Sequence, residues 1–185
     1  MIRQTAFGAA ISTIVLASAF ISSSMPTHSS INSSTHKLIP AQNVPISSNQ
    51  VASFTNFKTS ELEKSVFEKI NQYRAARRLP KLNLDSQISK QARIHSQNMA
   101  SGKVPFSHKG FEKRVNIIPI RYQSAAENVA FNQGYDNPAA EAVRGWIKSP
   151  EHLINIKGNY NLTGIGVAAN KDGEVYLTQI FIRSR

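Results

Sequence analysis

The C-terminal segment limits the fold most strongly, because it predicts a β-hairpin whose two strands are apolar on both faces. The first strand covers residues 163–169, a polar turn follows at 170–173, and the second strand covers 174–182. A sheet that is buried on both faces needs helices on both faces. We therefore expect an α+β fold, a three-layer α-β-α sandwich with an antiparallel sheet, in a single domain.

Two helices are predicted before the hairpin. Ser60 and Glu63 form a capping box, so we expect the first helix to begin at Ser60. We interpret Asp85 as the N-cap of a second helix that runs to about Ser101. His95 lies on the apolar face of this second helix. We interpret it as a buried histidine that is hydrogen-bonded to a neighbouring group, rather than as a ligand.

A third helix is predicted between Asn137 and the Ser149-Pro150 step. Asn137 is its expected N-cap, a proline follows at the first helical position, and Trp146 would anchor the helix near its end. The Ser149-Pro150 step stops the helix, because a residue before proline disfavours the α conformation. We expect Glu151 and His152 to lie in a short ordered break beside the core.

The N-terminal residues have the pattern of a targeting segment. Residues 1–19 combine the charge of Arg3, an apolar run and the small residues Ala17-Ser18-Ala19, which predicts a secretory signal peptide. An uncleaved membrane anchor is the alternative, but the apolar run is shorter than a bilayer span. Residues 20–58 are rich in Ser, Thr, Asn and Pro without periodicity, so we expect a flexible linker. Residues 59–185 are the predicted folded domain.

The chain contains no cysteine. An exported chain of this kind has no disulfide framework, so its fold must be held by its apolar core. This composition favours a bacterial protein that is secreted, extracellular or located at the cell envelope. We expect a monomer with no transmembrane span once the signal peptide is removed.

The chain is strongly basic, with a formal net charge of +11. Nineteen of its 22 Lys and Arg residues and all 11 acidic residues lie from Ser60 onward, so the domain itself is basic. Excess positive charge attracts polyanions. For an exported chain these partners would be acidic envelope polymers, anionic glycans or lipid headgroups. We do not expect nucleic acid, because the basic residues are scattered and lack interleaved aromatic residues.

Three titratable residues are candidates for a functional site. His108 lies in a loop between two glycines, where its side chain is free to turn toward the core. Glu127 is surrounded by Ala and Val, and a carboxylate in such a run needs a partner if it is buried. His152 follows the helix-breaking proline. These residues are far apart in sequence, so only the fold can bring them together.

These residues fall in a series of motifs that resembles the CAP superfamily, the group of cysteine-rich secretory proteins, venom antigen five and pathogenesis-related plant proteins. The resemblance is to the cysteine-free bacterial form, the SCP domain, and extends over the whole predicted domain. It implies secretion and an α-β-α sandwich. The matching motifs, in chain order, are Asn71-x-x-Arg74-x-x-Arg77, Ser107-His108, Ala126-Glu127-Asn128-Val129-Ala130, Gly145-Trp146-x-x-Ser149-Pro150-x-His152-x-x-Asn155-Ile156, Gly164-Ile165-Gly166-Val167 and Thr178-Gln179-Ile180-Phe181.

The resemblance also implies a site. Eukaryotic CAP proteins carry a cavity tetrad of two histidines and two glutamates. His108 matches the first histidine, and Glu127 matches the first glutamate. The second glutamate falls on Ser149 and the second histidine on Tyr176, so this chain departs from the tetrad at both positions.

The bacterial Ser-Pro-x-His motif suggests that His152 occupies the space of the missing tetrad members. We therefore assign possible catalytic roles to Glu127, His108 and His152, and possible metal-binding roles to His108 and His152. Five further residues are expected around the cavity: Glu151, Tyr176, Ser149, Asn128 and Gln179.

Two histidines with a carboxylate allow three kinds of chemistry. They can bind a divalent metal such as zinc, act as acid and base around a water, or form a buried polar network without a ligand. The sequence contains no Gly-x-Ser-x-Gly or His-Glu-x-x-His motif. We therefore expect an exported protein that binds a ligand, lipid or divalent ion in a His/Glu-lined cavity. The alternative is a metal-assisted hydrolase of wall polymer or peptide, so enzymatic activity is left open.

Overall fold

The computed structural model describes residues 48–185, with side chains from Lys58 onward. The expected signal peptide and the linker up to residue 47 lie outside the described residues. The described elements, in chain order, are α1 (Ser48–Ala76), β1 (Asn83–Leu84), α2 (Ser86–Ala100), α3 (Phe111–Asn116), β2 (Tyr122–Gln133), α4 (Pro138–Lys148), α5 (Pro150–Lys157), β3 (Leu162–Ala169) and β4 (Glu174–Ser184).

The four strands form one sheet in the order β1-β3-β4-β2. β3 and β4 form the predicted antiparallel hairpin, in which Gly166 lies opposite Thr178. β2 pairs antiparallel with β4 and forms one edge of the sheet. The short β1 pairs parallel with the start of β3, so the sheet is antiparallel except for this pair. β2 was not predicted from the sequence, although its apolar run was recognised.

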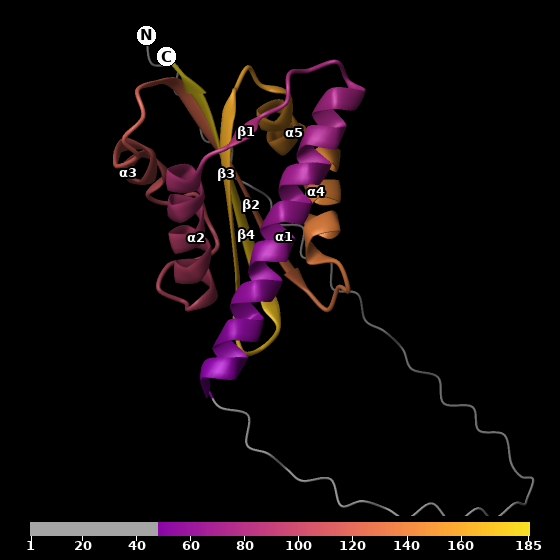
Figure 1. Cartoon of the computed structure of the whole chain (residues 1–185), viewed down its shortest axis with the longest axis vertical. Helices are drawn as coiled ribbons and strands as arrows, with labels where there is room; N and C mark the ends of the chain where they lie inside the picture. The colour runs from indigo at the N-terminus through magenta and orange to yellow at the C-terminus, as the bar shows by residue number, and fades with distance from the viewer. Residues whose placement is uncertain (1–47) are drawn as a thin grey trace, which may run out of the picture. The chain divides into compact units, whose positions relative to one another are not determined.

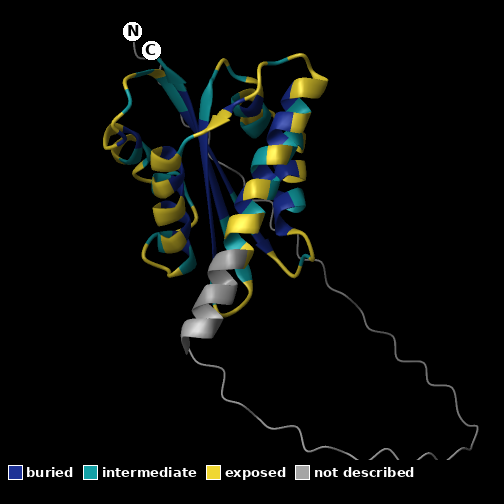
Figure 2. Cartoon of the chain, in the orientation of Figure 1, coloured by how far each residue is buried: buried dark blue, intermediate teal, exposed yellow. Residues whose placement is uncertain are grey.

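Helices cover both faces of the sheet. α2 and α3 lie on one face, and α1, α4 and α5 lie on the other (Figure 1). Each face has its own apolar cluster, one that includes Ile88 and Ile180 and one that includes Val66 and Phe181. The strands between these layers are largely buried, whereas the outer helix surfaces are exposed (Figure 2). The predicted three-layer α-β-α sandwich is confirmed.

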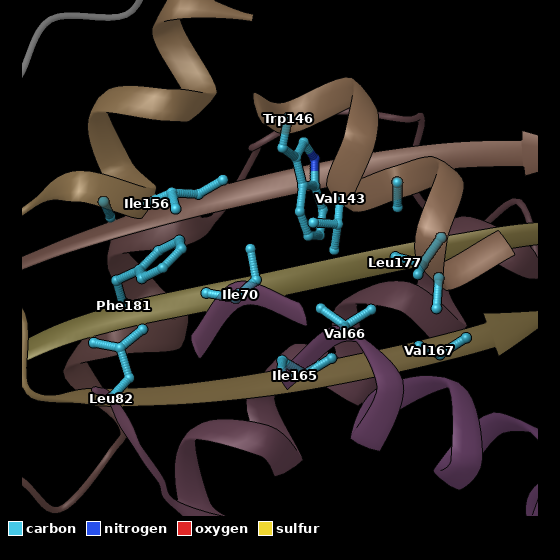
Figure 3. Packing of buried hydrophobic residues seen from close by; sticks show 13 residues of the cluster. Val66, Ile70, Leu82, Val143, Trp146, Ile156, Ile165, Val167, Leu177 and Phe181 are labelled. Atoms are coloured by element: carbon cyan, nitrogen blue, oxygen red, sulfur yellow. The ribbon is translucent and has the colours of Figure 1, made fainter. Parts of the chain in front are cut away.

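The larger apolar cluster lies between the sheet and the helices α1, α4 and α5. Side chains of α1 and α4, among them Ile70 and Val143, meet strand residues such as Leu177 (Figure 3). Trp146 is 2% exposed, and its indole Nε1 donates to the carbonyl of Val129 over 2.9 Å. The predicted anchoring role of Trp146 is therefore confirmed, and the anchor also joins α4 to β2.

The first helix starts earlier than the sequence predicts. α1 begins at Ser48, so the prediction that Ser60 is its N-cap is wrong, and residues 48–58 of the expected linker are helical. Glu63 of the expected capping box has a different role. Its carboxylate accepts hydrogen bonds from Arg93 of α2 over 2.7 Å and from the backbone N–H of Val167 over 3.1 Å. Glu63 thus satisfies an outward-facing amide of β3, beyond the short stretch that β1 covers.

The other helix boundaries agree better with the sequence. The Asp85 side chain accepts from the first amides of α2, and the Asn137 side chain accepts from the amide of Ala140, which confirms both N-caps. α4 ends at Lys148, before the predicted break. The break itself is shorter than expected: Glu151 and His152 lie in the helix α5, because Pro150 is well suited to the first helical position.

Arg74 of α1 connects several segments at one end of the domain. Its side chain is 1% exposed, and its guanidinium donates to the carbonyls of Pro80, Ile156, Gly158 and Tyr160 over 2.7 to 3.4 Å. Burial lowers the pKa of this guanidinium. Arg74 therefore fixes the end of α1, the connection to β1 and the connection from α5 to β3 in one arrangement.

Two glycines of β3 allow α2 to lie very close to the sheet. A Cβ at Gly164 would overlap the backbone of Ile88 and Ser89, and a Cβ at Gly166 would overlap the backbone of Ala92 and Arg93. Because the obstructing atoms belong to a helix backbone, no side chain can turn away to make room. The Gly-Ile-Gly motif is thus explained by packing.

We predict that Gly166→Ala lowers the free energy of unfolding by about 3 kcal/mol or more, because the new methyl group must push α2 away from β3. Urea unfolding followed by circular dichroism measures the loss. Gly145→Ala is the matched control, since this helical position has open space around it and alanine favours helices. Equal stability of the Gly166 variant and the wild type would contradict the packing explanation.

Candidate functional site

The candidate residues lie around β2, the edge strand of the sheet. Side chains alternate along a strand, so Ala125 packs in the cluster under α2 and α3, whereas Ala126 packs in the cluster under α1 and α4. Glu127 therefore faces α2 and α3, and Asn128 faces α4 and α5. The carboxylate and the amide of the Glu127-Asn128 motif, although adjacent in sequence, therefore lie on opposite faces of the sheet.

Glu127 is almost completely buried and is paired with a cation. Its side chain is 1% exposed, and both of its carboxylate oxygens accept hydrogen bonds from Arg114 of α3, at distances from 2.7 to 3.1 Å. His108 lies on the same carboxylate, with its Nδ1 3.0 Å from Oε1. We call Glu127, Arg114 and His108 the Glu127 cluster.

The contacts within the Glu127 cluster define what each group can do. An ionised carboxylate has about four acceptor sites, and the bonds from Arg114 and His108 use this capacity. Because an ionised carboxylate only accepts, His108 donates from Nδ1. This contact fixes the ring orientation and directs Nε2 away from Glu127. Glu127 therefore orients His108, and the nitrogen left to meet a ligand is His108 Nε2.

His152 lies on α5, at the other side of the β2 edge. Its Nδ1 is 2.8 Å from the hydroxyl of Ser149, and its backbone carbonyl accepts from the side-chain amide of Asn128. Asn155 adds a hydrogen bond to Asn128 over 2.9 Å. Burial lowers the pKa of His152, and the nearby His108 lowers it further. The structure therefore brings His108 and Glu127 into direct contact and holds His152 near them with partners of its own.

The remaining predicted positions are distributed over both faces. Ser149 and Asn128 contact or support His152 as described. Glu151 is exposed in the first turn of α5. Tyr176 packs on Phe131, with ring centroids 5.2 Å apart, and donates to Glu174, whereas Gln179 donates to Thr163. Tyr176 thus occupies the second histidine position of the tetrad as part of an aromatic cluster.

His95 supports the loop that carries His108. It is 2% exposed, and its Nε2 lies 2.8 Å from the carbonyl of Ser107, the residue before His108. Burial is the main cause that lowers the pKa of His95; the Glu127 charge opposes this effect, and the Arg114 charge adds to it. The prediction of a buried, hydrogen-bonded histidine is confirmed.

Arg114 was not among the site residues predicted from the sequence. The sequence did indicate that Glu127 needs a partner, because a carboxylate buried in an apolar run requires a cation. Arg114 was a candidate for this cation, since it lies in a short helix next to the buried Val115. Other Lys and Arg residues of the chain could also have paired with Glu127, so only the fold identifies Arg114 as its partner.

The donor set of the site does not fit a resident zinc ion. Within the described part of the chain, no group of three or more His, Cys, Asp or Glu residues could hold a metal ion. A protein-held zinc site uses at least three such ligands, and the carboxylate of Glu127 is engaged by Arg114.

Two hollows lie elsewhere on the domain. One, of about 330 Å³, is lined by α1, α2 and the end of β3, including Glu63 and Arg93. The other, of about 400 Å³, is a mainly apolar groove between α1 and α4, lined in part by Tyr73 and Ile147. Neither contains a member of the Glu127 cluster.

The family can now be assigned. Residues 67–181 match the model of the CAP (Cysteine-rich secretory protein) family, which is more than half of the chain. The chain therefore belongs to the CAP family. Like the predicted bacterial form, it has this fold without any cysteine.

Several bacterial proteins are similar to this chain. The chain is 34% identical over 160 residues to the protein YkwD of Bacillus subtilis (strain 168), covering 80% of this chain and 60% of that protein. Among solved structures, it is 25% identical, with a TM-score of 0.56, to an extracellular SCP-domain protein from Bacillus anthracis, covering 76% of this chain and 45% of the other.

A cysteine-rich secretory protein from Staphylococcus aureus shares the fold, with a TM-score of 0.53 at 20% identity over 82% of this chain and 44% of the other. The chain thus spans between 44% and 60% of the length of these three proteins. Within residues 48–185, no helix is long and apolar enough to cross a membrane.

We predict that Arg114→Ala lowers the free energy of unfolding by about 3–5 kcal/mol, because it leaves the Glu127 carboxylate buried without its cation. Chemical denaturation measures this loss. The control is Arg144→Ala, which removes an exposed partner of Glu141 and should cost at most about 1 kcal/mol. Similar small losses for both variants would show that the buried ion pair does not support the fold.

A second prediction concerns pH. A histidine whose folded pKa is lowered binds fewer protons in the folded than in the unfolded state, so stability falls as pH drops below the unfolded value of about 6.5. His95→Gln keeps a donor for the Ser107 carbonyl but does not titrate, so its stability should fall less between about pH 7.5 and about pH 5. Urea unfolding at both pH values measures the difference, and identical pH dependence of variant and wild type would contradict it.

Proposed function

We propose that this CAP-domain protein is exported and acts outside the cell or at the cell envelope as a binding protein, with His108 as the central recognition residue. The observation that carries the proposal is the complete engagement of Glu127 by Arg114 and His108. This arrangement favours a fixed imidazole that receives a ligand over a carboxylate that takes up protons during catalysis.

The geometry indicates which ligand groups would fit. The His108 side chain is 30% exposed, and with Nδ1 donating to Glu127, the neutral ring offers Nε2 as an acceptor. Hydroxyl and amide groups, which envelope glycans and peptides present, can donate to this nitrogen. His152 lies close enough for its charge to be coupled to that of His108, so it would border the same ligand.

Export is part of the proposal. Its support is the signal-peptide pattern in residues 1–19 and the similarity to an extracellular SCP-domain protein. The alternative, a metal-assisted hydrolase of wall polymer or peptide, has less support, because the donor set does not fit a resident zinc ion.

We predict that the purified chain binds soluble envelope glycan or peptide fragments without releasing new reducing ends or amines. His108→Gln keeps a donor for Glu127 but loses the imidazole acceptor, so it should weaken binding about tenfold. Calorimetry with the fragments, and separately with Zn²⁺, measures binding, and chemical assays of the fragments measure turnover.

The control variant is Lys171→Gln, an exposed position in the hairpin turn, which should bind like the wild type. Release of fragments by the wild type that is abolished in His108→Gln would identify a hydrolase. Unchanged binding by His108→Gln would refute the role of His108 in recognition.

A further inference from the structure

Three connections meet at one end of the sheet. The α1–β1 and α5–β3 connections are tied together by Arg74, which donates to Pro80 and to Gly158. The start of β2 lies beside the end of β4, where Tyr122 is opposite Ser184, and the start of β3 lies beside the same strand. The α3–β2 connection therefore reaches the same end, as Figure 1 shows.

This end carries a concentration of positive charge, which we call the cationic end. Each of the three connections contributes at least one exposed Lys or Arg, and none of these takes part in an ion pair among the described residues. The stretches 77–84, 113–126 and 152–162 contain no Asp or Glu. The cationic end consists of Arg77, Arg78, Lys81, Arg121 and Lys157.

One of these charged side chains and part of the backbone that carries the others are held in place, and the opposite end of the sheet has no similar excess of positive charge. Arg77 lies over the ring of Tyr73, 4.4 Å from its centroid, and the backbone around Pro80 and Gly158 is fixed by Arg74. Asp85, the next acidic residue after the α1–β1 connection, is engaged as the N-cap of α2. The turns at the other end of the sheet, 134–137 and 170–173, contain two aspartates and one lysine.

Exposed aliphatic side chains accompany these charges. Ile117 is 64% exposed in the α3–β2 connection, and Leu84 is 53% exposed in β1, next to the α1–β1 connection. Lysine and arginine together with protruding aliphatic side chains are the combination that binds the interface of an anionic bilayer.

We propose that the cationic end docks onto an anionic phospholipid surface. The charges come from three separate connections at the same end of the sheet. A flat surface such as a bilayer can therefore contact all three connections at once. Positively charged residues at such a surface interact with the diffuse negative potential of the lipid headgroups without a specific pocket. This proposal does not involve the Glu127 cluster, so it can be tested independently of the proposed function.

Binding to vesicles of phosphatidylcholine with phosphatidylglycerol, compared with phosphatidylcholine alone, tests the proposal on the full chain. We expect tighter binding to the anionic vesicles that weakens with salt. Each lost charge should reduce the partition coefficient about fivefold, so the loss of four should reduce it about 600-fold. The four substitutions of the test variant are Arg78→Gln, Lys81→Gln, Arg121→Gln and Lys157→Gln.

A matched control changes the net charge equally elsewhere on the domain. Its positions are exposed, and we expect a loss of less than about fivefold, because charges away from the membrane are screened. A second pair tests the aliphatic contact: Ile117→Gln should weaken binding at high salt, whereas Ile94→Gln on α2 should not. The four control substitutions are Lys64→Gln, Lys90→Gln, Lys103→Gln and Lys171→Gln.

The orientation can be measured because the chain has no cysteine of its own. A polarity-sensitive fluorophore on Asn159→Cys, in the α5–β3 connection, should shift to shorter wavelength on anionic vesicles. The same fluorophore on Asp172→Cys, at the opposite end, should not. This comparison also separates docking of the domain from any binding by residues 1–47.

Three results would overturn the proposal. Equal losses in the test and control variants would mean that only net charge matters. A shift at Asp172→Cys without one at Asn159→Cys would place another surface on the lipid. Binding to a soluble polyol-phosphate polymer, with no preference for anionic vesicles, would show that the partner is a polymer. Normal vesicle binding by His108→Gln is expected whether or not the proposed function is correct.

Discussion

The arrangement of this domain depends on one buried cation. The guanidinium of Arg74 has backbone carbonyls as its partners, from the α1–β1 connection and from the end of α5 onward. Removing a charge from water is costly, and several carbonyl dipoles together offset this cost. The same contacts position α5, which carries His152, and the connections that form the cationic end. The candidate site and the proposed docking surface therefore share one structural support, although they lie on different parts of the domain.

A second buried charge, the Glu127 carboxylate, determines how the residues of the candidate site are arranged. Arg114 neutralises it, and His108 is oriented by it. In the CAP resemblance, Glu127 and His108 appear as members of one tetrad, which led to the hypothesis that Glu127 has a catalytic role. The ion pair with Arg114 instead favours a supporting role for Glu127. In the proposed function, His108, which is partly exposed, is the residue that meets a ligand.

The sequence predicts those features of the fold that depend on local patterns. The hairpin, the caps at Asp85 and Asn137 and the buried position of His95 all follow from spacing and residue type. The start of α1 could not be predicted, because residues 48–58 have the composition of a linker and Ser60 imitates a cap. β2 was missed because Glu127 and Asn128 interrupt the alternation of apolar and polar residues that marks a strand. Their side chains lie on opposite faces of the sheet, and each finds its hydrogen-bond partners on its own face. For the site, the sequence indicates which residues take part but not their pairing.

Glu63 opposes strand pairing between copies of this protein at high concentration. β1 pairs with only two residues of β3, which would leave the rest of that strand able to pair with another molecule. The Glu63 carboxylate takes the place of a neighbouring strand's carbonyl at Val167, and the Ser89 hydroxyl lies at the amide of Ile165. This edge is closed to sheet growth from one molecule to the next, which protects a disulfide-free domain against fibril formation.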